Sequence, residues 1–153
     1  MSCRIYMDHA ATTEMLPEVR EAMEPYLREE YGNASTSYDM GVRMHDAIEE
    51  AREKIAWVID AQPEEIFFTS GGSESDNWVI KSVAGEKKNS GKHLITTRIE
   101  HHAVLRSCQY LESLGYEVTY LDVDDYGLVS AKEVVHALRE DTTLVSVMTG
   151  NNE

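Results

Sequence analysis

Apolar residues recur at helical spacing in the first part of the chain. One stripe predicts a helix that begins near Pro17, and it consists of Leu16, Val19, Met23 and Leu27. We expect Pro25 to interrupt or kink this helix. After a polar loop at residues 31–41, a second stripe predicts a longer helix, and its members are Met44, Ile48, Ala51, Ile55 and Ile59.

Short apolar and β-branched runs then alternate with further helical patterns. Strands are predicted over residues 66–69, 93–97, 117–121 and 144–148. Helices are predicted between them at about residues 74–83, 104–114 and 130–139, and Ser130 and Glu133 predict a capping box for the last helix. This alternation predicts an α/β fold, a doubly wound and mainly parallel sheet with flanking helices, which binds ligands at the carboxyl ends of its strands.

Length and charge narrow the class of protein. The 153 residues suit one domain, and no apolar run approaches the length of a membrane span. Since the N-terminus lacks a basic segment followed by an apolar stretch, we expect a cytoplasmic protein. The net charge of −14 argues against nucleic acid as a partner. Cys3 and Cys108 fit no metal-ligand spacing, so we expect reduced thiols and no metal.

A glycine pair follows the strand predicted at residues 66–69. Gly71 and Gly72 lead into a helix for which Ser73 is the expected cap, with Asp76 three residues on. Such a turn exposes backbone N–H groups at the positive end of a helix dipole, which suits a phosphate. The alternative is that the glycines only tighten a strand-to-helix turn.

Two more polar clusters follow predicted strands. Glu100, His101 and His102 come after residues 93–97, and Asn151, Asn152 and Glu153 come after residues 144–148. Because parallel strands end at the same edge of a sheet, these clusters and the glycine turn are expected to converge on one crevice. The alternative for the histidines is that they cap the following helix or lie in solvent.

Together these motifs resemble the N-terminal part of the NifS-like cysteine desulfurases, which belong to the class V aminotransferases and use pyridoxal 5′-phosphate. The motifs occur in family order and at family spacing over essentially the whole chain. They are residues 8–13 (DHAATT), 31–35 (YGNAS), 68–77 (FTSGGSESDN), 100–104 (EHHAV) and 151–153 (NNE).

The resemblance implies roles for the matching residues. The turn at Gly71, Gly72 and Ser73 would bind the cofactor phosphate, through backbone amides and the Ser73 hydroxyl. His101 would stack on the pyridine ring and take part in proton transfers, and Asn152 would hydrogen-bond the phenolic oxygen of the ring. Residues 8–13 would lie near the mouth of the site.

Some residues depart from the family pattern. Ala34 replaces a usual proline, Tyr38 a usual histidine, and Gly150 a bulkier residue. The Schiff-base lysine, the carboxylate that pairs with the pyridine nitrogen and the nucleophilic cysteine of the family would all lie beyond residue 153. We expect Cys108, on the apolar stripe of a helix, to be buried and inert. Cys3 has no evident activating neighbour.

The resemblance also implies an incomplete domain. Residues 1–153 would form the N-terminal segment and the first half of the large cofactor-binding domain, without the small C-terminal domain. The strands at 93–97, 117–121 and 144–148 would be neighbours, whereas 66–69 would lack a partner and 144–148 would leave an apolar edge. We therefore expect residues 1–153 alone to be marginally stable and inactive.

The implied activity is the conversion of L-cysteine to L-alanine, with transfer of sulfur as an enzyme persulfide for iron–sulfur cluster or thio-cofactor synthesis. A homodimer and a sulfur-acceptor protein are also implied. Another class V enzyme, such as a selenocysteine lyase or an aminotransferase, and a non-catalytic or split fragment stay open. A nicotinamide enzyme is the last choice, because the turn lacks the G-x-G-x-x-G spacing.

Overall fold

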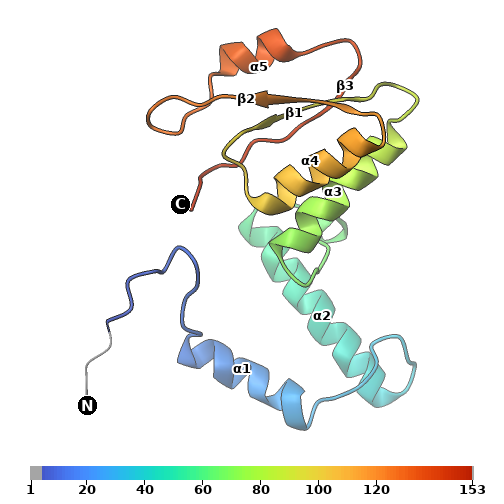
Figure 1. Cartoon of the computed structure of the whole chain (residues 1–153). Helices are drawn as coiled ribbons and strands as arrows, with labels where there is room; N and C mark the ends of the chain where they lie inside the picture. Colours follow the sequence, from blue (N-terminus) through green and yellow to red (C-terminus); the bar gives the residue numbers. More distant parts are fainter. Residues whose placement is uncertain (1–4, 153) are drawn as a thin grey trace. The chain divides into compact units, whose positions relative to one another are not determined.

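The computed structural model describes residues 5–152 and divides the chain into two compact units, residues 1–68 and 69–153. Figure 1 follows the chain through both units. Cys3 and Glu153, on which the sequence analysis touches, lie outside the described residues. In the described part, no helix is both long enough and apolar enough to cross a membrane.

The first unit is helical. It contains α1 (Pro17–Arg28), α2 (Asp39–Val58) and the short 3₁₀ helix η1 (Pro63–Glu65). Pro25 does not interrupt α1, which continues through it to Arg28, and the Pro25 carbonyl accepts the N–H groups of Glu29 and Glu30. The predicted helices are therefore present, but α1 contains no buried residue.

The residues that join α2 to the second unit do not pair with any strand of the described chain. Arg52 of α2 donates a hydrogen bond to the carbonyl of Ile66, and its guanidinium carbon lies 5.1 Å from the centre of the Phe68 ring. Residues 66–69 form no strand in the described chain. The strand predicted there is wrong, because no neighbouring strand offers it a hydrogen-bonding ladder.

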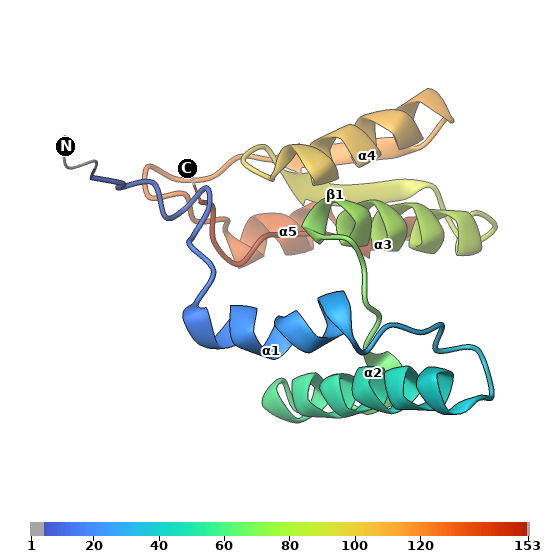
Figure 2. The ribbon, with the colours of Figure 1, turned by 90° about the horizontal axis from the view of Figure 1, so that it is seen from below.

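The second unit is a parallel sheet with helices on both faces. Its strands are β1 (His93–Thr97), β2 (Glu117–Leu121) and β3 (Thr142–Val145), in the order β2-β1-β3. Figures 1 and 2 show α3 (Gly72–Glu86) and α4 (His102–Ser113) on one face and α5 (Ala131–Ala137) on the other. The predicted α/β class, the parallel sheet and the neighbouring strands are confirmed.

The core of this unit lies between β1 and the pair α3 and α4. It consists of Ile80, Ala84, Leu94, Val104, Cys108 and Leu111. All five residues of β1 are buried, as expected of a central strand. Cys108 is 1% exposed, which confirms its predicted burial, and this burial raises the pKa of its thiol to about 11.

Ser73 is not the cap of α3, and Ser130 occupies the predicted N-cap position of α5 but without the predicted capping box. The helix α3 begins one residue earlier than Ser73, with Gly71 as its N-cap, so Ser73 already lies in the first turn. Ser130 makes no side-chain hydrogen bond at the start of α5, and Glu133 is exposed to solvent. Both residues have the right spacing for a cap, but neither side chain folds back onto the free N–H groups of its helix.

Candidate functional site

The turn that leads into α3 offers free backbone donors. The first helical hydrogen bonds are donated by Glu74 and Ser75 to the carbonyl of Gly71, at 3.1 Å each. The N–H groups of Gly72 and Ser73 precede these bonds, so they have no partner within the helix. Gly71 has a φ of +156°, a conformation that favours glycine.

The same turn is held in place by its own side chains. The Glu74 carboxylate accepts the Ser70 N–H at 2.6 Å, and this hydrogen bond holds the pKa of Glu74 below its usual value. The hydroxyls of Thr69 and Ser75 lie 2.8 Å apart and share a hydrogen bond. A Cβ built on Gly71 or Gly72 would meet no atom within 4 Å, so the open side of the turn has room for a ligand.

His101 is the N-cap of α4. Its Nδ1 accepts the backbone N–H of Ala103 at 3.1 Å, while the side chain stays exposed. A neutral imidazole whose Nδ1 accepts a hydrogen bond carries its proton on Nε2. His101 therefore caps α4 through Nδ1, as the alternative prediction had it, and Nε2 stays available for a second role.

The turn after β1 is tied to the segment after β3. The buried Glu100 accepts the Met148 N–H through Oε1 at 2.7 Å, and the same oxygen accepts the Thr97 hydroxyl at 3.1 Å. The Asn151 side chain donates to the Ile99 carbonyl at 2.8 Å. The sequence indicated Glu100 and Asn151 only as members of polar clusters. Nothing in the sequence indicated that these two side chains connect the turn after β1 to the segment after β3.

Two of the polar clusters follow β1 and β3 at the carboxyl edge of the sheet, and the glycine turn begins α3, which packs beside α4. Figures 1 and 2 both show α3 and α4 side by side with their N-terminal ends at the same side. The segment that carries Asn152 follows the carboxyl end of β3. A hollow of about 210 Å³ opens at this edge, lined by residues that include Thr97, Leu128 and Asn151. The ligand-binding roles of Gly71, Gly72, Ser73, His101 and Asn152 stay predictions.

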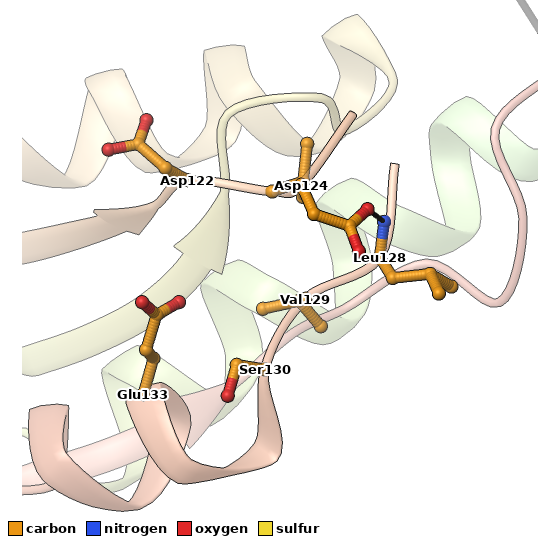
Figure 3. A pocket seen from close by; sticks show the side chains of 7 residues that line it. Asp122, Asp124, Leu128, Val129, Ser130 and Glu133 are labelled. Atoms are coloured by element: carbon orange, nitrogen blue, oxygen red, sulfur yellow. Dashed lines mark hydrogen bonds between the residues drawn. The ribbon is translucent and has the colours of Figure 1, made fainter. Parts of the chain in front are cut away.

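A second hollow, of about 290 Å³, is acidic. Figure 3 shows Asp122, Asp124 and Glu133 around it, between β2 and the start of α5. Asp124 has a local role, because its Oδ1 accepts the N–H groups of Tyr126 and Leu128 at 2.9 Å and so shapes the loop. Within residues 5–152, no three His, Cys, Asp or Glu side chains are grouped to hold a metal ion.

Comparison with known families decides the class. The sequence model of the family described as "Aminotransferase class-V" matches residues 5–153. The chain belongs to the class V aminotransferase family. The resemblance drawn from the five motifs is therefore confirmed at the level of the family.

Individual members of this family match over nearly the whole chain. The chain is 53% identical over 149 residues to a cysteine desulfurase IscS of Methanosarcina thermophila, and 52% identical over 153 residues to that of Dictyoglomus turgidum. These alignments cover 97% and 100% of the chain, but only 37% and 39% of the relatives. The chain thus spans about two fifths of the length of the curated relatives it matches.

Solved structures give the same assignment. A NifS-like protein matches with a TM-score of 0.96 and 44% identity, over 99% of this chain and 42% of that one. SspA in complex with cysteine matches with a TM-score of 0.93 and 42% identity, over 97% and 43% of the two chains. Both support the predicted fold of the large domain.

Proposed function

We propose that the protein containing this chain is a cysteine desulfurase that depends on pyridoxal phosphate. L-cysteine would be converted to L-alanine, and its sulfur would pass to an enzyme cysteine as a persulfide. The observation that carries the proposal is the identity of just over half of the aligned residues to IscS proteins, in alignments that cover 97% and 100% of the chain. The similarity to SspA, whose structure is a complex with cysteine, supports the same substrate.

The residues present fit the cofactor. A phosphate needs several hydrogen-bond donors and open space, and the Gly71–Ser73 turn has both. The unpaired N–H groups of Gly72 and Ser73 would hold the phosphate, and the Ser73 hydroxyl would add a further donor. His101 would lie against the ring, and the Asn152 amide would donate to the phenolic oxygen.

The local donors matter because the whole chain is acidic. With a net charge of −14, the protein repels an anion at long range, so the phosphate must be held by short hydrogen bonds and the dipole of α3. When bound, pyridoxal phosphate draws electrons from the substrate and so weakens bonds next to the amino group. The contribution of this chain is to bind the phosphate, orient the ring and move protons.

His101 would transfer those protons through Nε2. Its Nδ1 is engaged by the Ala103 N–H, which fixes the tautomer and restrains the ring. A general acid or base in this position contributes roughly 10²- to 10⁴-fold to the rate. The cap on α4 would therefore have two functions, one for the helix and one for the substrate.

The test is an assay of the full-length protein with pyridoxal phosphate and L-cysteine. We expect L-alanine and sulfide in equal amounts under reducing conditions. His101→Gln should lower kcat at least about 100-fold. The exposed neighbour provides the control, since His102→Gln should leave kcat near that of the parent. Absence of alanine from the parent protein, with cofactor bound, would refute the desulfurase assignment.

We further propose that residues 1–153 alone are inactive. None of the lysines in this chain has the sequence context of the family's Schiff-base lysine, and Lys81 is engaged by the Asn77 side chain at 2.6 Å. The 153-residue chain should show no alanine formation at any cofactor concentration. Turnover by this chain alone would show that its own residues complete the site.

The oligomeric state, the protein partner and the cellular location of the enzyme are also proposals. The family resemblance supports a homodimer, a sulfur-acceptor protein and a role in iron–sulfur cluster assembly. A cytoplasmic location is part of the same proposal. Size-exclusion chromatography with light scattering of the full-length protein tests the dimer, which should have twice the mass of one chain.

A further inference from the structure

Glu100 is a buried carboxylate that directly precedes the proposed catalytic histidine. Only 6% of the residue is exposed, and its Oε1 accepts two hydrogen bonds, from the Thr97 hydroxyl and the Met148 N–H. Burial of a charge is costly unless donors surround it. Since its oxygen is directed toward β1 and the segment after β3, Glu100 is not available to touch a ligand through that atom.

The bond to Met148 joins two segments that are distant in sequence. Residues 98–101 follow β1 and carry His101, while residues 146–152 follow β3 and carry Asn152. The Asn151 side chain adds a second link, from the same segment to the Ile99 carbonyl at 2.8 Å. Two hydrogen bonds between short segments restrain both the distance and the rotation of one relative to the other.

We propose that Glu100 is a positioning residue, which fixes the Asn152 segment against the His101 turn so that both side chains address one cofactor ring. This inference rests on the proposed function. Glu100 acts through the Met148 backbone and not on the ring. A carboxylate suits the task, because hydrogen bonds to a charged acceptor are stronger than neutral ones and hold the segment more firmly.

The first test is hydrogen exchange in the full-length protein without cofactor. Glu100→Ala removes the acceptor of the Met148 N–H, so exchange of a peptide spanning residues 146–152 should accelerate roughly tenfold or more. Glu100→Gln keeps an acceptor oxygen and should give an intermediate rate. The control is Glu86→Ala, at an exposed position of α3, which should leave this peptide unchanged. Unchanged exchange in Glu100→Ala would overturn the proposal.

The second test uses the protein saturated with pyridoxal phosphate. If Glu100 sets the orientation of the ring, Glu100→Ala should weaken the visible circular dichroism of the bound cofactor and lower kcat more than it raises KM, with partial rescue in Glu100→Gln. A purely structural role would lower the melting temperature but leave the dichroism of the saturated variant at the parent value. That result would overturn the positioning role.

The two proposals fail in different ways. If the parent protein binds no pyridoxal phosphate, the proposed function fails, while the exchange measurement still reports on the link between Glu100 and Met148. If the parent forms alanine from cysteine but Glu100→Ala keeps the parent exchange and dichroism, the desulfurase assignment stands and the role of Glu100 is refuted.

Discussion

Helices with similar apolar stripes differ greatly in burial between the two units. In α4 of the second unit, Val104, Cys108 and Leu111 are 5%, 1% and 3% exposed. In α1 of the first unit, Val19 and Leu27 are 46% and 71% exposed. Both stripes predict amphipathic helices correctly. Periodicity therefore reveals an apolar face but not whether the chain supplies a partner for it.

Alanine substitutions in the apolar stripes of α4 and α1 should have very different effects on stability. In the 153-residue chain, Leu111→Ala should lower the free energy of unfolding by about 3 kcal/mol, because it leaves a cavity in the core. Leu27→Ala should change it by less than about 0.5 kcal/mol, since that side chain is mostly exposed. Urea unfolding followed by circular dichroism measures both. Equal losses would contradict the difference between the units.

A second effect depends on pH and on His93 in β1. Its Nδ1 and Nε2 lie 2.8 Å from the hydroxyls of Thr142 and Thr119, so the imidazole links all three strands. Burial lowers the pKa of His93, helped by the charge of Arg139 and opposed by Asp141 and Glu117.

The sign of this effect follows from proton binding. Below about pH 6.5 the unfolded chain takes up a proton at this histidine that the folded chain resists, so stability falls as pH decreases toward the lowered pKa. His93→Gln should flatten this part of the stability profile. The exposed His45→Gln, on α2, should leave the slope unchanged. A parent profile with no loss of stability from pH 7 to 5 would refute the prediction.

A smaller effect concerns an unpaired hydroxyl. Thr96 is fully buried in β1, and its Oγ1 has no hydrogen-bond partner among the described residues. Thr96→Val keeps the shape and removes the polar atom, so it should raise the free energy of unfolding by about 1 kcal/mol. Thr13→Val, at an exposed position before α1, serves as the control and should have no such effect. Destabilisation by Thr96→Val would show that the hydroxyl has a partner.

The smallest effect belongs to an ion pair on α2. Lys54 Nζ lies 2.6 Å from the Glu50 carboxylate, but both side chains are exposed. Solvent screens such pairs, so Lys54→Gln should leave the melting temperature unchanged within error, at low and at high salt. A clear drop at low salt would mean that charges stabilise the first unit where burial does not.

The local sequence pattern predicted most helices and strands of the second unit. The strands at 93–97 and 117–121 were predicted at their observed bounds, since compact apolar runs there meet partners within the described chain. The strand at 66–69 was predicted equally well by local pattern and does not form. Strand formation depends on a neighbour, and no property of Ile66 or Phe67 encodes whether that neighbour is present.

The candidate site could be named only in part, and its ligand-binding roles stay predictions. The glycine turn, His101 and Asn152 could be named because residue type, order and spacing indicate chemistry. The hydrogen bonds that hold these residues in place could not be predicted. Glu100 accepts from Met148 and Asn151 donates to Ile99, and the partners are about fifty positions apart in the sequence. Helix caps failed for a similar reason, since Ser130 has the right neighbours in sequence but its side chain does not turn toward the helix.

The proposed function requires the start of α3 to hold the phosphate of the cofactor. The most direct measurement is a crystal structure of the full-length protein with pyridoxal phosphate. We expect the phosphate at the N–H groups of Gly72 and Ser73, the ring against His101 and the phenolic oxygen beside Asn152. A phosphate bound elsewhere, with the Gly71–Ser73 turn empty, would contradict it.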